Sequence, residues 1–235
     1  MKPPVPSRIL VVPALLAALV LLPVSATAVN ITGTGQDDVL KGKPSDDTIK
    51  GLSGNDSIQA GGGNDQVYGG PGNDYMHLGT GDDVGRGGSG VDDIRAVDGN
   101  DRVLGGDGDD HVAGGRGDDR VEGQAGKDEL DGGDGSDLLF DGPGDDQVTG
   151  DAGGDTIYVG PGADLIYAEE GIDHIFATND GAKDWIYCGL ASEPAGTWGD
   201  ITYIGSRDPN EDVVQRCDDI IIQPARPIQR VRSEP

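Results

Sequence analysis

Aspartate is the residue whose type and spacing in this sequence could do chemistry, because it recurs at every ninth position over more than half of the chain. Its carboxylate can ligate a hard cation through oxygen or, in a close pair, act as a general acid and base. An enzyme uses one such pair, whereas this sequence repeats its carboxylates in a row, so the spacing favours cation binding over catalysis. The sixteen aspartates of this series are Asp38, Asp47, Asp56, Asp65, Asp74, Asp83, Asp92, Asp101, Asp110, Asp119, Asp128, Asp137, Asp146, Asp155, Asp164 and Asp173.

Glycine and aliphatic residues accompany the series aspartates at fixed distances. Glycine stands two residues before fourteen of them, the exceptions being Gln36 and Ser45, and an aliphatic residue or Met stands two residues after each one except at Gly85. Glycine permits the positive φ values of tight turns, and the residues after each Asp alternate as in a short strand with one buried face. We therefore expect turns that carry the aspartates and strands that carry the core. At Gly85 we expect a gap, which Val84 could fill only through a bulge.

This pattern resembles the hemolysin-type calcium-binding repeat, the RTX nonapeptide Gly-Gly-x-Gly-x-Asp-x-U-x in which U is a large aliphatic residue. The resemblance implies an all-β fold, a parallel β-roll or β-solenoid in which six residues turn, three form a strand, and two nonapeptides complete one coil. We place this roll at residues 29–176. Five repeats match every specified position, and they begin at Gly69, Gly87, Gly105, Gly114 and Gly132.

The resemblance also implies that several Ca²⁺ ions are bound between turns eighteen residues apart, for instance between those carrying Asp92 and Asp110. Asp38, Asp47 and Asp173 are expected to be weaker ligands, because the edge repeats lack glycines that the others have. The expected ligands of the stronger sites are Asp56, Asp65, Asp74, Asp83, Asp92, Asp101, Asp110, Asp119, Asp128, Asp137, Asp146, Asp155 and Asp164.

The composition suggests that the bare chain does not fold by itself. The formal net charge is -26, with 42 Gly, 14 Pro and only 4% aromatic residues, which is typical of a disordered chain. Such a polyanion is unsuited to nucleic acid or to an anionic membrane surface. We therefore expect calcium binding and folding to be one process.

The first 28 residues have the pattern of a secretory signal peptide. Lys2 and Arg8 precede an apolar stretch at 9–22, and small residues at 26–28 offer a cleavage site before Val29. The stretch is shorter than the ~18 to 20 residues that span a bilayer. The sequence therefore predicts a secreted, extracellular protein with no membrane span.

The strict period ends after Ala177, where aromatic residues and both cysteines appear. Asp184 and Ile186 keep the register of the repeat after a two-residue insertion. We expect a small C-terminal cap at residues 177–222, closed by a Cys188–Cys217 disulfide because these are the two cysteines of an exported chain. A thiol metal site is the alternative for the cysteines. Residues 223–235 are expected to be a flexible tail.

The sequence thus predicts a secreted calcium-binding repeat protein with a structural, accessory or surface-interaction role, and any glycan or cell-surface partner is unknown. It predicts no enzyme, since His77, His111 and His174 lie far apart and no nucleophile motif accompanies them. One alternative is an ice-binding β-roll, which the single Thr80 at the third turn position disfavours. Another is a non-catalytic module related to RTX exoenzymes or toxins, although these usually carry a large catalytic or hydrophobic region and leave the cell by a C-terminal signal.

Overall fold

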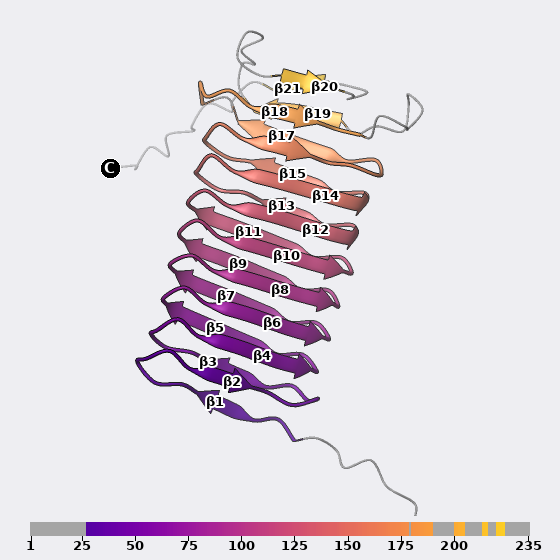
Figure 1. Ribbon diagram of the computed structural model, residues 1–235. Coiled ribbons are helices and arrows are strands. Elements are labelled where there is room, and N and C mark those ends of the chain that lie inside the picture. Colours follow the sequence, from indigo (N-terminus) through magenta and orange to yellow (C-terminus); the bar gives the residue numbers. More distant parts are fainter. Residues whose placement is uncertain (1–26, 179, 190–199, 205–212, 216–219, 224–235) are drawn as a thin grey trace, which may run out of the picture.

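The computed structural model describes residues 27–178, 180–189, 200–204, 213–215 and 220–223. These residues form two parallel β-sheets that lie face to face, with the chain coiling from one sheet to the other and back (Figure 1). Sequential strands alternate between the sheets, so each strand pairs with the strand two places along the chain. The predicted all-β parallel roll is confirmed.

The odd-numbered strands form an eleven-stranded sheet and the even-numbered strands a ten-stranded sheet. The first sheet contains β1 (Asn30–Thr32), β3 (Thr48–Lys50), β5 (Gln66–Pro71), β7 (Val84–Ser89), β9 (Arg102–Asp107), β11 (Arg120–Ala125), β13 (Leu138–Phe140), β15 (Thr156–Val159), β17 (His174–Thr178), β19 (Asp200–Ile204) and β21 (Ile220–Gln223). The second contains β2 (Val39–Lys41), β4 (Ser57–Gly62), β6 (Tyr75–Thr80), β8 (Asp93–Asp98), β10 (His111–Arg116), β12 (Glu129–Gly135), β14 (Gln147–Gly153), β16 (Leu165–Tyr167), β18 (Trp185–Tyr187) and β20 (Val213–Gln215).

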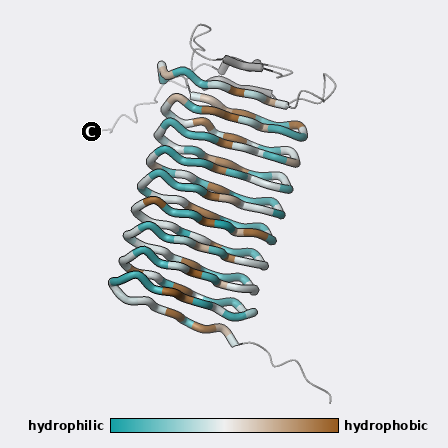
Figure 2. Tube along the Cα trace, viewed as in Figure 1, coloured by the Kyte–Doolittle hydropathy of each residue, from teal (hydrophilic) through white to brown (hydrophobic). Residues whose placement is uncertain are grey.

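The register between neighbouring strands is eighteen residues over the repeats. Val112 pairs with Ile94 on one side and with Leu130 on the other, and all three are buried between the sheets. Figure 2 shows the result as apolar segments in the strands and hydrophilic segments in the turns. The aliphatic position of each repeat therefore builds the core, as the sequence predicts, and the turns emerge at the two edges of the roll.

The strands are longer in the middle of the roll than the three residues expected. Strands β4 to β11 have six residues each. The extension occurs because the second glycine position of the repeat and the residue after it also pair with their neighbours, for instance Gly88 with Gly70 and Gly106. Backbone pairing therefore continues to the start of each turn, and it fixes the position of the turns that hold the aspartates.

The gap at Gly85 is real, and Val84 does not fill it through a bulge. Gly85 pairs in register with Val67 and Val103. A Cβ on Gly85 would lie 2.9 Å from Cδ1 of Leu78, which is fully buried. Leu78 reaches across from the opposite sheet and fills the space that the missing aliphatic side chain leaves.

We expect Leu78→Ala to destabilise the calcium-loaded protein by about 3 kcal/mol, because it leaves a cavity beside Gly85. Adding Gly85→Val should restore most of this loss, since valine occupies the same position at Val67 and Val103. Gly85→Val alone should destabilise by crowding Leu78. Denaturant unfolding of the three variants measures this coupling, and a double variant no more stable than Leu78→Ala would contradict it.

The C-terminal segment continues the two sheets. Strand β18 pairs with β16 and β20, and β19 pairs with β17 and β21, all in parallel. Ile186 pairs with Ile166, which confirms that the register survives the two-residue insertion. The described residues contain no helix long and apolar enough to cross a membrane. Most of the predicted signal peptide, nearly all of the predicted tail, and Cys217 lie outside the described residues.

Candidate metal-binding turns

The series aspartates form two columns, one at each edge of the roll, because alternate repeats turn at opposite edges. Within a column the backbone N–H of one aspartate donates to Oδ1 of the aspartate eighteen residues later, as from Asp92 to Asp110 at 2.8 Å and from Asp101 to Asp119 at 2.7 Å. The same bond recurs at 2.6 to 2.9 Å from the Asp47–Asp65 pair to the Asp155–Asp173 pair. The structure thus brings together the aspartates that the sequence predicts to share a site.

The second carboxylate oxygen of these aspartates has a different environment. In thirteen series aspartates Oδ2 is buried and has no hydrogen-bond partner, although each of these residues is at most 3% exposed. A buried carboxylate oxygen without a donor is costly, and cations are among the partners that remove the cost. The thirteen are Asp56, Asp65, Asp74, Asp83, Asp92, Asp101, Asp110, Asp119, Asp128, Asp137, Asp146, Asp155 and Asp164.

Backbone carbonyl oxygens from the next coil approach the same place. A Cβ on Gly105 would lie 2.6 Å from Oδ2 of Asp110 and 2.8 Å from the carbonyl oxygen of Gly123. At Gly114 the corresponding oxygens belong to Asp119 and Gly132. The first glycine of the repeat therefore leaves open a spot on which a carboxylate and a carbonyl oxygen from different coils converge.

Three central turns carry a side chain at this first position. Ala60, Leu78 and Ala96 precede Asp65, Asp83 and Asp101 by five residues, and their side chains lie in the core. The space that glycine leaves open elsewhere is partly occupied in these turns. The turns that keep the first glycine, such as the one ending at Asp110, are the roomier candidates for a cation.

The other turn glycines allow the chain to turn where a side chain would be strained. Gly106 has φ of +133° and Gly108 of +136°, a region that L-residues with side chains rarely adopt. A Cβ on either residue would also collide with a carbonyl oxygen of the preceding coil. These glycines let successive turns stack closely, which keeps the aspartates of one column within hydrogen-bond distance.

Burial raises the pKa of the central series aspartates. It raises the pKa of Asp83, Asp101 and Asp110 to about 7, with carboxylates of adjacent turns adding to the rise and the backbone hydrogen bond opposing it. The pKa of Asp65 and of Asp74 rises to about 6 for the same leading reason. The turns thus hold carboxylates whose negative charge lacks compensation from the protein.

The first two repeats differ from the middle of the roll. Oδ2 of Asp47 accepts a hydrogen bond from the backbone N–H of Lys43 at 2.7 Å, and Oδ2 of Asp38 accepts one from the Thr34 hydroxyl at 2.9 Å. These two oxygens already have donors, which supports the prediction that Asp38 and Asp47 are weaker ligands. Asp173 is buried and keeps the ladder bond through Oδ1.

Most series aspartates are directly preceded by a polar residue, and this residue has a structural role. At most of these exposed positions its side-chain oxygen accepts the backbone N–H eighteen residues later, as when Asp109 accepts from Lys127 at 2.9 Å and Asn100 from Asp118 at 3.1 Å. Asn serves here as well as Asp. The adjacent acidic pairs are therefore repeat features, as expected. The first member accepts a backbone hydrogen bond at the surface, and the second is the buried series aspartate.

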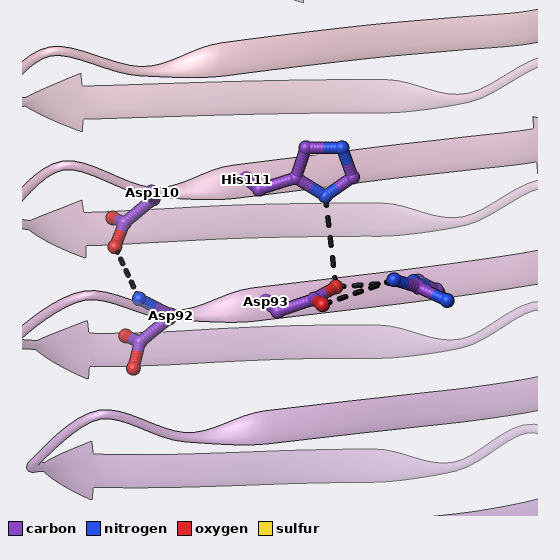
Figure 3. A network of polar contacts seen from close by, with 5 residues as sticks. Asp92, Asp93, Asp110 and His111 are labelled. Atoms are coloured by element: carbon purple, nitrogen blue, oxygen red, sulfur yellow. Dashed lines mark hydrogen bonds and ion pairs between the residues drawn. The ribbon is translucent and has the colours of Figure 1, made fainter.

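Figure 3 shows how the chemistry changes immediately after the turn. Asp92 and Asp110 are joined by the ladder hydrogen bond, while the next residues, Asp93 and His111, lie on the outer face of the sheet with Nδ1 and Oδ1 3.5 Å apart. Asp93 also accepts two hydrogen bonds from the Arg95 guanidinium. His111 is partly exposed and lies beside the Asp93–Arg95 ion pair, which agrees with its interpretation as a surface side chain.

Two aspartates outside the predicted ligand set lie at these turns. Asp184 continues the column through the two-residue insertion, because its Oδ1 accepts the backbone N–H of Asp164 at 3.1 Å. Asp141 occupies a first-glycine position and lies close to Asp146 and Asp164. The sequence signal for Asp184 is the Asp-x-Ile spacing, which is intact there, and the signal for Asp141 is an acidic residue in place of a turn glycine.

These residues fit a hard divalent cation. Carboxylate and carbonyl oxygens are the ligands that Ca²⁺ takes, in six- to eight-coordinate and tolerant geometry. The unpartnered Oδ2 atoms and the open space beside the first glycine are the observations that support this fit. A bound Ca²⁺ would supply charge compensation and a link between coils, and the protein would supply the fixed spacing of its oxygens.

Comparison with protein families gives a match to the RTX calcium-binding nonapeptide repeat (4 copies), at residues 32–63, 51–85, 86–121, 104–139 and 140–175. These segments span more than half of the chain and contain every series aspartate. A search of curated proteins finds no match.

Proposed function

The chain belongs to the family of RTX calcium-binding nonapeptide repeats, and from this membership we propose that it is a secreted protein whose β-roll folds as its turns bind several Ca²⁺ ions. The observation that carries the proposal is the row of thirteen buried Oδ2 atoms without donors. At the turns that keep the first glycine, the chain offers further oxygen ligands beside this atom, as at Asp110 and Gly123. These oxygens offer binding positions for cations at both edges of the roll.

Calcium binding by the purified protein tests this proposal. Isothermal titration calorimetry with CaCl₂ at neutral pH should give several ions per chain, at the ~0.1 to 1 mM affinities typical of extracellular modules. Mg²⁺ at the same concentration should compete poorly, because it demands octahedral geometry and gives up water reluctantly. Less than one bound Ca²⁺ per chain at millimolar concentration would contradict the proposal.

Export is the second part of the proposal, and it rests on the charged, apolar and small-residue pattern of residues 1–28. The protein recovered outside its producing cells should begin at Val29. An intact Met1 on protein retained inside the cell would contradict export. An extracellular location also suits the chain, because calcium is available there and the turns need it.

A Cys188–Cys217 disulfide is the third part. Cys188 is buried directly after β18, and β18 pairs with β20 so that Tyr187 stands opposite Gln215. In the sequence, Cys188 comes one residue after Tyr187 and Cys217 comes two residues after Gln215, the partner of Tyr187. A peptide containing both cysteines, found by mass spectrometry without reduction and absent after reduction, would support the bond.

We propose no catalytic step for this protein. The histidines of the described region lie on outer sheet faces, and the acidic pairs serve the hydrogen-bond series of the turns. A structural, accessory or surface-interaction role is the one that a long, rigid, calcium-loaded roll suits best.

A further inference from the structure

One turn of the roll carries an acidic residue where the preceding turns of the same column carry glycine. Asp141 stands eighteen residues after Gly123 and thirty-six after Gly105 in the same coil position. At Gly105 and Gly123 a Cβ would lie within 2.8 Å of the Oδ2 atom of the following series aspartate. A side chain at this position therefore starts directly beside the carboxylate of its own turn, which for Asp141 is Asp146.

The carboxylate of Asp141 is buried and only half satisfied. Its Oδ1 accepts hydrogen bonds from the backbone N–H groups of Gly142, at 2.6 Å, and Gly160, at 2.7 Å. Its Oδ2 is buried and has no partner, and the residue as a whole has 0% exposure. An oxygen left in this state needs a proton or a cation.

Two further carboxylates lie close to that of Asp141. Asp141, Asp146 and Asp164 each offer an oxygen within 4.8 Å of the others, and all three residues are buried. The Oδ2 atoms of Asp146 and Asp164 also lack partners, whereas their Oδ1 atoms accept the ladder bonds. In the part of the chain that the structure describes, no other three acidic, histidine or cysteine side chains converge in this way.

Three buried carboxylates repel one another strongly unless a cation lies among them, because the surroundings are poorly hydrated. Burial, and then the charge of Asp164, raises the pKa of Asp141 to about 8. The number of charged ligands is one of the features that set calcium affinity. A third carboxylate therefore distinguishes this turn from those that rely on the series aspartates alone.

We propose that Asp141, Asp146 and Asp164 form a three-carboxylate calcium site that fills at a lower Ca²⁺ concentration than the other turns. This inference rests on the proposed calcium-binding function and adds an order of filling to it. The competing explanation is structural: Asp141 could serve only as the acceptor for Gly142 and Gly160, replacing strand pairing where β13 ends at Phe140.

Two substitutions of Asp141 separate these explanations in the full chain. Asp141→Asn keeps an oxygen acceptor for both N–H groups and removes the charge, and Asp141→Gly restores the glycine of the column. Asp131→Asn is the matched control, because it removes one carboxylate from a different acidic pair, Asp131 with Asp151, whose members do not belong to the three-carboxylate group. Calorimetry with CaCl₂ measures binding, and circular dichroism of the calcium-depleted protein measures the bare roll.

We expect the unaltered protein and Asp131→Asn to show a first binding step of about one ion, separated from the rest by roughly tenfold in concentration. Both Asp141 variants should lose that step and keep the later ones. Without calcium, Asp141→Asn should retain as much β-structure as the unaltered protein or more, because it removes a buried charge.

A calcium titration of Asp141→Asn that superimposes on that of the unaltered protein would overturn the inference and leave Asp141 as a hydrogen-bond acceptor. Loss of the first step in Asp131→Asn as well would also overturn it, since the effect would then belong to net charge. If the unaltered protein binds calcium without a distinct first step, the inference fails while the proposed function stands. If it binds none, the proposed function itself fails.

Discussion

Replacing Asp110 by Asn is expected to remove bound calcium from the centre of the roll and to raise the Ca²⁺ concentration needed for folding by roughly threefold to tenfold. Asn keeps the oxygen that accepts the Asp92 N–H, so the ladder hydrogen bond survives. It replaces the buried, unpartnered Oδ2 with an amide NH₂ group, which donates hydrogen bonds and cannot ligate a cation. Because each coil contacts only its neighbours, a weakened turn in the middle also interrupts coupling along the column.

Asp109→Asn is the matched control for this experiment. It makes the same change of charge one residue away, at an exposed position where the oxygen that accepts the Lys127 N–H is retained. Asn already occupies the corresponding position at Asn73 and Asn100. We expect this control to titrate with calcium like the unaltered protein, and equal effects of the two substitutions would show that Oδ2 of Asp110 has no special role.

The calcium-free roll is expected to have an inverted dependence on pH, being more structured near pH 5 than near pH 8. The pKa of Asp83, Asp101 and Asp119 is raised to about 7 in the folded protein, mainly by burial, against about 3.9 in an unfolded chain. The folded calcium-free state therefore binds more protons than the unfolded state between these values. Its stability is greatest below about pH 4 and is lost as the pH rises through about 7.

Calcium should reverse this dependence. Ca²⁺ needs the ionised carboxylate, so protons compete with it, and the calcium-loaded roll should be stable at pH 7 to 8 and lose calcium on acidification. Circular dichroism of calcium-depleted protein and of protein in millimolar CaCl₂, each measured from pH 4.5 to 8, gives two curves that should run in opposite directions. Calcium-depleted protein that is at least as structured at pH 8 as at pH 5 would contradict the expectation.

The nine-residue period, together with the resemblance to RTX repeats that it carries, was sufficient to predict the architecture. One position per repeat had to be buried and one had to lie in the turn, and Val112 and Asp110 lie accordingly. The eighteen-residue spacing of the columns followed from two repeats per coil, and the register of Ile186 could be predicted across an insertion because its Asp-x-Ile pattern is intact. The expectation of weaker edge ligands came from missing glycines and stays a prediction, whereas the donor that occupies Oδ2 of Asp47 could not be anticipated.

What the sequence could not predict depends on contacts between residues far apart in the chain or on departures from the repeat. Leu78 fills the space at Gly85 from the opposite sheet, and no pattern within one repeat indicates such a contact. In the repeat pattern, Asp141 is only a departure from the expected glycine. The stacking of coils is what places it beside Asp164. That Oδ1 accepts the ladder hydrogen bond while Oδ2 stays without a partner could likewise be known only from the positions of two neighbouring turns.

The link between calcium binding and folding is the centre of this account, and a calcium titration followed by circular dichroism and small-angle X-ray scattering tests it most directly. At neutral pH in chelator, the protein should show little β-structure and a radius of gyration near 50 Å, as expected for an unfolded chain of about this length. Millimolar Ca²⁺ should produce the β signal and a cooperative compaction to roughly half that radius or less, and equal Mg²⁺ should not. A protein that is equally compact and equally rich in β-structure in chelator and in calcium would contradict the account.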